Sequence, residues 1–134
     1  MLDPVVYSIR LAGHTSEVSP GVLRRIETEL PDGARLESEV LFADESSFRE
    51  QGTIRFGPAS ELRFRTLGTG HLSASSDPGL LHGTVTWEVD GGSGRFEGAS
   101  GRISSNFTVT NDGEVADAQL GLVFLAPLPK GAAR

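Results

Sequence analysis

The sequence predicts one all-β domain that folds as an eight-stranded, antiparallel, up-and-down β-barrel. Segments of alternating polar and apolar residues fill most of the 134 residues, and few stretches show a helical period. The 17 glycines, nearly twice the usual share of about 7%, fall between these segments as turns do. Apolar residues of consecutive segments also align on one face. A closed barrel buries that face and leaves no bare strand edge.

The barrel domain is expected over residues 1–126, followed by a C-terminal tail at 127–134. A chain of this length is long enough to bury a substantial core, and a second domain is not expected. The eight strands are predicted at 5–12, 22–30, 34–42, 49–57, 61–75, 80–90, 101–110 and 114–125.

The first strand carries Tyr7, the only tyrosine, on its inward face. Between the second and third strands, a turn of odd length with a bulge at Gly33 aligns their apolar residues. The pairs that this register predicts are Leu30–Leu36, Thr28–Ser38 and Ile26–Val40. It turns four glutamates outward, namely Glu27, Glu29, Glu37 and Glu39. A solvated face is expected there, because an acid/base site needs a carboxylate buried beside its substrate.

The fourth and fifth strands are joined by "GPAS". The predicted pairs are Phe56–Leu62 and Ile54–Phe64. Three arginines, Arg55, Arg63 and Arg65, then lie outside, where they offset the acidic stripe of the neighbouring strands.

In the fifth strand every second residue, including Phe64, Thr66 and Leu72, is expected to point inward. In the sixth strand the inward residues include Val85 and Trp87. Glycine on an inward face marks a bend or a space left for a ligand. We therefore expect room inside the barrel at Gly68, Gly70 and Gly83.

The last two strands are joined by "NDGE", which predicts a two-residue Asp112-Gly113 hairpin. The resulting pairs are Val109–Ala116, Phe107–Ala118 and Ser105–Leu120. Leu120, Leu122 and Phe124 then point inward, and Val123 and Leu125 form an outer apolar patch. Such a patch needs covering, so we expect a homodimer through this strand, with a trimer as the alternative.

The glycine-rich stretch "EVDGGSGRFEGASGRI", residues 88–103, invites comparison with phosphate-binding loops. A dinucleotide fingerprint needs a third glycine where Glu97 stands, and a helix where an alternating segment follows. A Walker pattern is absent. A nucleophile elbow is excluded as well, because arginine replaces the last glycine after both Ser93 and Ser100. Two turns flanking a short piece around Phe96 are expected instead.

The run "GRFEGASG" at 94–101 resembles the Gly-x-aromatic-x-Gly-x-x-Gly signature of the allene oxide cyclase-like barrel superfamily. That group includes plant allene oxide cyclases, dirigent proteins and small bacterial cyclases similar to spirotetronate-forming Diels–Alderases. The resemblance implies a barrel that holds an apolar small molecule and guides its ring closure without a cofactor. The polar catalytic set of the plant enzymes does not map onto this sequence.

Composition narrows the classes of partner. The chain has no cysteine for a disulfide or a thiolate zinc site, and its three histidines, His14, His71 and His82, lack ligand spacing, so no metal is expected. A net charge of −6, from 12 basic and 18 acidic residues, argues against nucleic acid. The first residues show neither a basic signal region nor a long apolar run. We therefore expect a cytoplasmic protein without membrane contact.

Tyr7 and Trp87 are the candidate catalytic residues, because each is the only one of its kind, is expected inside and can donate a hydrogen bond. The alternative is that both simply fill the core. Inward hydroxyl and aromatic side chains suggest a mainly apolar cavity that contains a few polar groups. Buried hydroxyls, however, often form hydrogen bonds with the backbone instead. The candidate substrate-binding residues are Thr28, Ser38, Phe42, Phe64, Thr66, Ser105, Phe107 and Phe124.

The sequence thus leads to a cofactor-independent cyclase or isomerase of bacterial secondary metabolism, acting on an apolar polyketide-like substrate. A [4+2] Diels–Alder closure is the expected reaction, with a hydroxyl of Tyr7, Thr66 or Ser105 bonding a carbonyl. Holding a polyene in its reactive fold removes about 7–11 kcal/mol of barrier without proton transfer. The alternative is a non-catalytic small-molecule-binding barrel, a carrier or sequestering protein. A third option is a purely structural or interaction domain.

Overall fold

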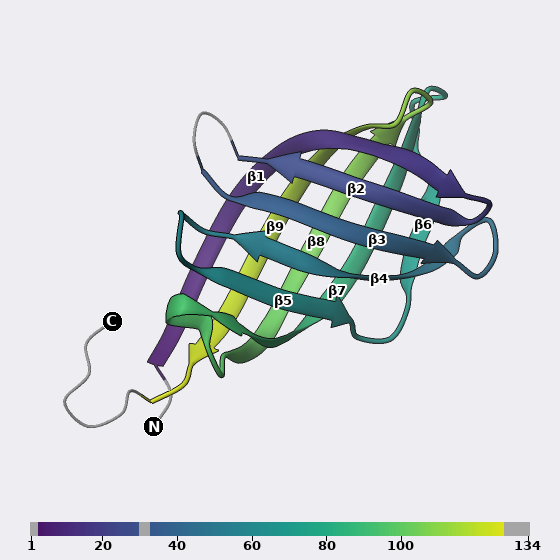
Figure 1. The fold of residues 1–134 in the computed structure, drawn as a ribbon. Coiled ribbons are helices and arrows are strands. Elements are labelled where there is room, and N and C mark those ends of the chain that lie inside the picture. The colour runs from purple at the N-terminus through teal and green to yellow at the C-terminus, as the bar shows by residue number, and fades with distance from the viewer. Residues whose placement is uncertain (1–2, 30–32, 128–134) are drawn as a thin grey trace.

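The computed structural model describes residues 3–29 and 33–127, which form a closed antiparallel β-barrel (Figure 1). A short 3-10 turn, η1 (Gly94–Phe96), is the only helical element among these residues. The strands are β1 (Asp3–Ser19), β2 (Val22–Thr28), β3 (Arg35–Phe42), β4 (Ser47–Arg55), β5 (Glu61–Thr66), β6 (Gly70–Ala74), β7 (Leu80–Ser93), β8 (Ser100–Thr110) and β9 (Glu114–Leu125). Because β5 and β6 share the place between β4 and β7, the barrel is eight-stranded, and the predicted fold class is confirmed.

Strand β1 closes the barrel because it pairs with two neighbouring strands. Residues 3–14 pair with β9, and residues 12–19 pair with β2. At the crossing, a Cβ on Gly13 would stand 1.8 Å from the carbonyl oxygen of Ile26. Glycine therefore lets the backbone of β2 approach closely where β1 passes from one neighbour to the other.

The strand predicted at 61–75 is interrupted at 67–69, where Gly68 takes a φ of +78°. The backbone of Glu50 on β4 faces this break. Its N–H donates to the Thr66 hydroxyl at 2.7 Å, and the same hydroxyl donates to its carbonyl at 2.9 Å. The Thr66 side chain thus replaces a missing ladder partner, which keeps the wall closed.

The register between β2 and β3 differs from the predicted one. The observed pairs are Leu23–Val40, Arg25–Ser38 and Glu27–Leu36. The predicted pairs Thr28–Ser38 and Ile26–Val40 were therefore wrong, and Leu30 of the third pair lies outside the described residues. The Glu29 N–H donates to the Ala34 carbonyl at 2.8 Å, which closes the turn around an even number of residues. Because the observed register differs from the predicted one by an odd number of residues, the side chains of β2 that were expected inside point outward, and those expected outside point inward.

The register between β8 and β9 also differs, by one residue. Gly113, with a φ of +84°, donates its N–H to the Thr110 carbonyl at 2.9 Å, so the loop has three residues, 111–113, rather than two. The observed pairs are Val109–Val115, Phe107–Asp117 and Ser105–Gln119. Every β9 side chain therefore lies on the face opposite to the predicted one. Leu120, Leu122 and Phe124 point outward, and Val123 and Leu125 are buried.

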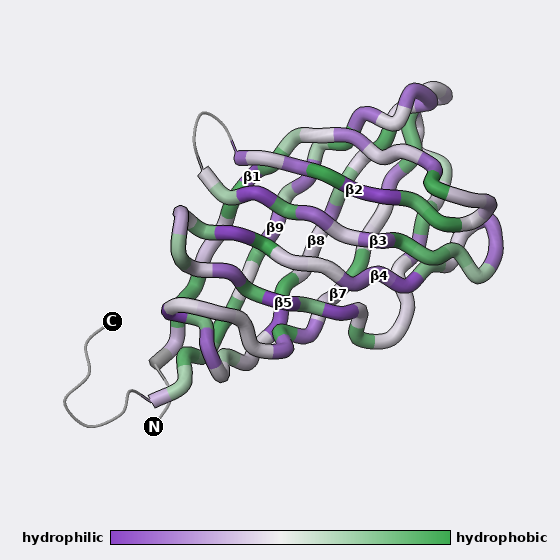
Figure 2. Tube along the Cα trace, viewed as in Figure 1, coloured by the Kyte–Doolittle hydropathy of each residue, from purple (hydrophilic) through white to green (hydrophobic). Residues whose placement is uncertain are grey.

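Between β4 and β5 the register is shifted by two residues, which preserves the parity. Ile54 pairs with Leu62, and both are fully buried, while Arg55, Arg63 and Arg65 are exposed as expected. Figure 2 shows polar and apolar positions alternating along these strands.

The end of the barrel that carries η1 is also where β1 begins and β9 ends (Figure 1), and it contains an aromatic cluster. The ring centroid of Phe56 lies 5.5 Å from that of Tyr7 and 5.5 Å from that of Phe96, which is buried. The middle of the glycine-rich stretch thus carries a buried phenylalanine, Phe96, which packs against Phe56. Tyr7, Phe56 and Phe96 therefore pack together at this end.

Candidate functional site

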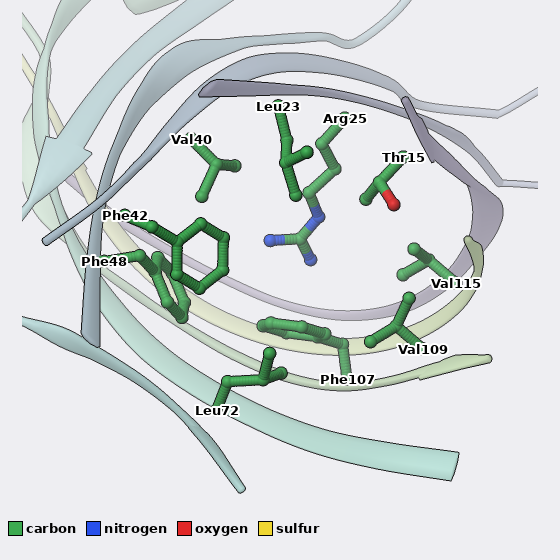
Figure 3. A pocket seen from close by; sticks show the side chains of 10 residues that line it. All are labelled: Thr15, Leu23, Arg25, Val40, Phe42, Phe48, Leu72, Phe107, Val109 and Val115. Carbon is green, nitrogen blue, oxygen red and sulfur yellow. The ribbon is translucent and has the colours of Figure 1, made fainter. Parts of the chain in front are cut away.

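The opposite end of the barrel contains an apolar mouth with a cavity of about 50 Å³ (Figure 3). Most of the ten residues that line it are aliphatic or aromatic, and seven strands contribute them. They are Thr15, Leu23, Arg25, Val40, Phe42, Phe48, Leu72, Phe107, Val109 and Val115.

Aromatic rings occupy the space that inward glycines leave near this mouth. A Cβ on Gly70 would stand 2.4 Å from the Phe48 ring, and one on Gly83 would stand 2.1 Å from the Phe107 ring. The rings of Phe48 and Phe107 lie 6.1 Å apart, centroid to centroid. Gly68 lies in an exposed turn, and a Cβ at this position would have no atom within 4 Å. The expected room at these glycines is therefore filled by phenylalanine, or, at Gly68, is outside the barrel.

The guanidinium of Arg25 points into the barrel at the inner limit of the mouth (Figure 3). Only 2% of this residue is exposed. Its central carbon lies 4.5 Å from the ring centroid of Phe107 and 5.5 Å from that of Trp87. Both aromatic faces therefore stabilise the cation from the apolar side.

Acidic and hydroxyl groups take up the donors of Arg25. Its Nε donates to Glu27, its Nη1 to both carboxylate oxygens of Glu50 at 3.1 and 3.2 Å, and its Nη2 to Asp117 at 2.8 Å and Ser105 at 3.0 Å. These five contacts match the five N–H donors of a guanidinium. No donor of Arg25 is left for a guest in the mouth.

A second layer of donors holds the carboxylates. Ser38 and the Trp87 indole N–H both donate to Glu50, the latter at 3.2 Å. Ser105 donates to Asp117 at 2.7 Å, and Gln119 donates to it at 2.8 Å. Three residues predicted to bind or act on a substrate, Ser38, Trp87 and Ser105, thus support a buried ionic network.

Three carboxylates share one guanidinium in this network, so the cluster favours retaining a proton. Burial raises the pKa of Glu27 to about 8; Arg25 opposes this rise, and the hydrogen bond and charge of Asp117 add to it. Burial alone would lower the pKa of Arg25, but the charges of Glu50, Glu27 and Asp117 raise it. Burial and Asp117 therefore favour the neutral form of Glu27, and Arg25 favours the ionised form.

Tyr7 lies in the aromatic cluster at the other end, away from the mouth. Its ring covers Gly121, where a Cβ would come within 2.0 Å, and its hydroxyl is buried with no hydrogen-bond partner among the described residues. Burial raises the pKa of Tyr7, and the charge of Asp117 adds to this effect.

The remaining predicted residues are dispersed. Phe42 and Phe107 line the mouth, and Phe64 stacks on Trp87 with the centroids 4.0 Å apart. Thr28 and Phe124 were expected inside, but their strand positions face outward. The predicted set therefore does not form one site.

Of the four glutamates expected in solvent, Glu37 and Glu39 are exposed. Glu27 is fully buried, which corrects the prediction. Glu29 is half-buried and accepts a hydrogen bond from the Ala34 N–H at 3.1 Å.

Sequence reasoning missed the charged residues of the interior. One signal was available, because Glu50 shares the parity of Ile54, which was placed inside. A three-residue loop at 111–113 would also have turned Asp117 and Gln119 inward. Arg25 and Glu27 gave no such signal, because their neighbour Ile26 was the natural inward choice on apolar grounds.

Within residues 3–29 and 33–127, no group of three or more histidine, aspartate or glutamate side chains is arranged to hold a metal ion. The same residues include no helix with the length and apolar character needed to cross a bilayer. Comparison of the chain with protein-family models, curated proteins and solved structures finds no match. The fold and the site define a closed antiparallel barrel with an apolar mouth above a buried ionic network.

Proposed function

We propose that this barrel binds the apolar end of a small molecule at its mouth. The observation that carries the proposal is the apolar cavity framed by Phe42, Phe48 and Phe107, at the end of the barrel opposite the cluster of Tyr7, Phe56 and Phe96. An apolar group that enters it leaves water and contacts ring faces and branched aliphatic side chains.

The size of the mouth sets the class of ligand. About 50 Å³ is far below the roughly 300–1,000 Å³ of pockets that enclose a whole drug-sized ligand. A short alkyl or aryl end fits, and the rest of the molecule would lie at the rim. Because the donors of Arg25 are all taken by protein acceptors, the bound end is uncharged.

Linear 1-alkanols from hexanol to dodecanol test the proposal by NMR. We expect saturable shifts of the methyl groups of Leu23, Leu72, Val109 and Val115. Affinity should rise about fourfold per added methylene, the equivalent of about 0.8 kcal/mol, while the chain end is still filling the mouth. Affinity should then level off once further methylenes remain in water.

Matched variants locate the site. Leu72→Trp places a large ring in the cavity and should weaken binding at least tenfold. Leu41→Trp makes the same change at an exposed position and should leave binding unchanged. Absence of saturable shifts, or equal effects of the two variants, would contradict the proposal.

A cofactor-independent cyclase is the second candidate function. Two observations favour it: three phenylalanine rings surround the mouth as stacking surfaces for a polyene, and Glu27, whose neutral form burial favours, lies beside Arg25, which lines the cavity. A polyketide-like substrate would require the rings of Phe42 and Phe48 to move aside, since the present cavity is small. Tyr7 and Trp87 would not contact a substrate bound there.

The two functions separate in one experiment with a linear diene–dienophile precursor. A cyclase accelerates ring closure over buffer and fixes its stereochemistry. Binding of the precursor with the rate and product ratio of buffer supports the binding function alone.

A further inference from the structure

The outer face of β9 carries an uninterrupted apolar strip. After Glu114 at the start of the strand, its outward residues are Ala116, Ala118, Leu120, Leu122 and Phe124, and none of these five is charged. Leu120 is 59% exposed and Leu122 42%, and Val6, which pairs with Leu122 from β1, is 69% exposed. Three of the most exposed large apolar side chains of the described chain therefore lie side by side.

The strands beside this strip add few charges. The outward residues of β1 opposite the strip are Pro4, Val6, Ser8, Arg10 and Ala12. Those of β8 are Ser100, Arg102, Ser104, Asn106 and Thr108. By contrast, β3, β4 and β5 present exposed arginine and glutamate side chains such as Arg35, Glu37, Arg49, Arg55, Arg63 and Arg65. In a chain of net charge −6, the face around β9 is neutral to slightly basic.

We propose that this strip is the contact surface for a second copy of the chain, with the β9 strands antiparallel and a two-fold axis at Leu120. The argument is the size gradient along the strip, which runs from alanine at one end to leucine and phenylalanine at the other. Two-fold packing about Leu120 sets Leu122 over Ala118 and Phe124 over Ala116 of the other copy. Leu120 then meets its own copy on the axis, and on both sides of the axis large side chains meet small ones, which makes the strip complementary to itself.

The flanking charges are compatible with this arrangement. The two-fold axis lies in the plane of the interface and runs perpendicular to the strands, so β1 packs over β1 of the other copy and β8 over β8. Leu122 and its partners on the neighbouring strands then face Ala118 and its partners on the other copy. Arg10 of one copy then faces Val6 of the other, and Arg102 faces Asn106. No like charges oppose each other.

The contact is small, because a barrel wall is convex. Three strands about 4.8 Å apart and nine residues at about 3.4 Å each outline roughly 400 Å² per copy. That area lies below the usual range of stable complexes, so a reversible dimer with a dissociation constant in the micromolar range is expected.

Sedimentation velocity over a concentration series tests the interface. The unmodified chain should dimerise reversibly. Leu120→Glu and Leu120→Lys, which place like charges against each other on the axis, should each be monomeric and folded. Leu41→Glu, at an exposed position of β3, should dimerise like the unmodified chain.

A mixture of Leu120→Glu and Leu120→Lys distinguishes this arrangement from any other contact that involves Leu120. Because residue 120 faces itself across the axis, the mixture should recover at least the affinity of the unmodified chain. A monomeric unmodified chain at 1 mM, dimers of either variant alone, or a mixture that stays monomeric would overturn the proposal. The mouth plays no part in this test, so its failure would leave the alkanol titration unaffected.

Discussion

Arg25 and Glu27 stand at consecutive inward positions of β2, and the Arg25 Nε donates a hydrogen bond to Glu27. Both side chains are almost completely buried. The burial of Arg25 is tolerable because every donor of the guanidinium meets an acceptor, whereas an unpaired buried charge costs several kcal/mol. Ionic complementarity with β4 and β9, rather than apolar alternation, therefore fixes which face of β2 points inward.

The stability of the protein should depend on the protonation of Glu27. Its pKa is about 8 in the folded chain against 4.5 for an ordinary glutamate. The folded state thus binds the proton more tightly, so this contribution to the free energy of unfolding is complete below pH 4.5 and is lost as pH rises towards 8. Urea denaturation at a series of pH values should show this decline, and Glu27→Gln should remove it.

The matched control is Glu37→Gln, which changes an exposed glutamate on β3 and should retain the decline. Equal pH profiles for the unmodified chain and Glu27→Gln would show that Glu27 is ionised in the folded chain throughout this range.

Removing the guanidinium should cost far more than removing an exposed arginine. In Arg25→Met, the carboxylates of Glu27, Glu50 and Asp117 lose their shared cation, and the expected loss in the free energy of unfolding is about 3–5 kcal/mol. Arg49→Met, at an exposed outward position of β4, should lose no more than about 0.5 kcal/mol.

If Arg25→Met is too unstable to measure, adding Glu50→Gln should recover part of the loss by removing one unpaired charge. Equal losses for Arg25→Met and Arg49→Met would contradict the assignment of Arg25 as the cation of the network.

Gly83→Ala should destabilise the barrel by about 1–3 kcal/mol, because the new Cβ would stand 2.1 Å from the Phe107 ring. Combining it with Phe107→Leu should reduce that cost, and the difference is the coupling between the two positions. Gly79→Ala is the control, since its nearest neighbour would lie 3.7 Å away. A cost that is identical with and without Phe107 would show that the ring does not fill the glycine space.

The alternation of apolar residues was sufficient to predict a closed antiparallel barrel and most strand positions. It was insufficient for register at three turns: the error between β4 and β5 preserved the faces, whereas those between β2 and β3 and between β8 and β9 each exchanged the faces of one strand. At 111–113, "NDG" supports both a two-residue and a three-residue loop, and only the second turns Asp117 and Gln119 inward. Local turn chemistry does not distinguish these loops, because the deciding contacts to Arg25 and Ser105 come from other strands.

The interior of β2 shows the same limit more strongly. Apolar patterning places Ile26 inside, yet Arg25 and Glu27 are there. Their stabilisation comes from Glu50 and Asp117, which lie 25 and 92 residues from Arg25 along the chain. Phe42 and Phe107 could be placed inside the barrel from parity, whereas their place at the mouth and the network beneath them required the three-dimensional contacts.

The most direct test of ligand binding at the mouth is a set of intermolecular NOEs from a bound 1-decanol to the protein. Binding as proposed predicts NOEs from the terminal methyl group to Phe107, Val109 and Val115, with the hydroxyl end near solvent. NOEs from that methyl group to the exposed Val6 and Leu120, without contacts to Phe107, would contradict binding in the mouth.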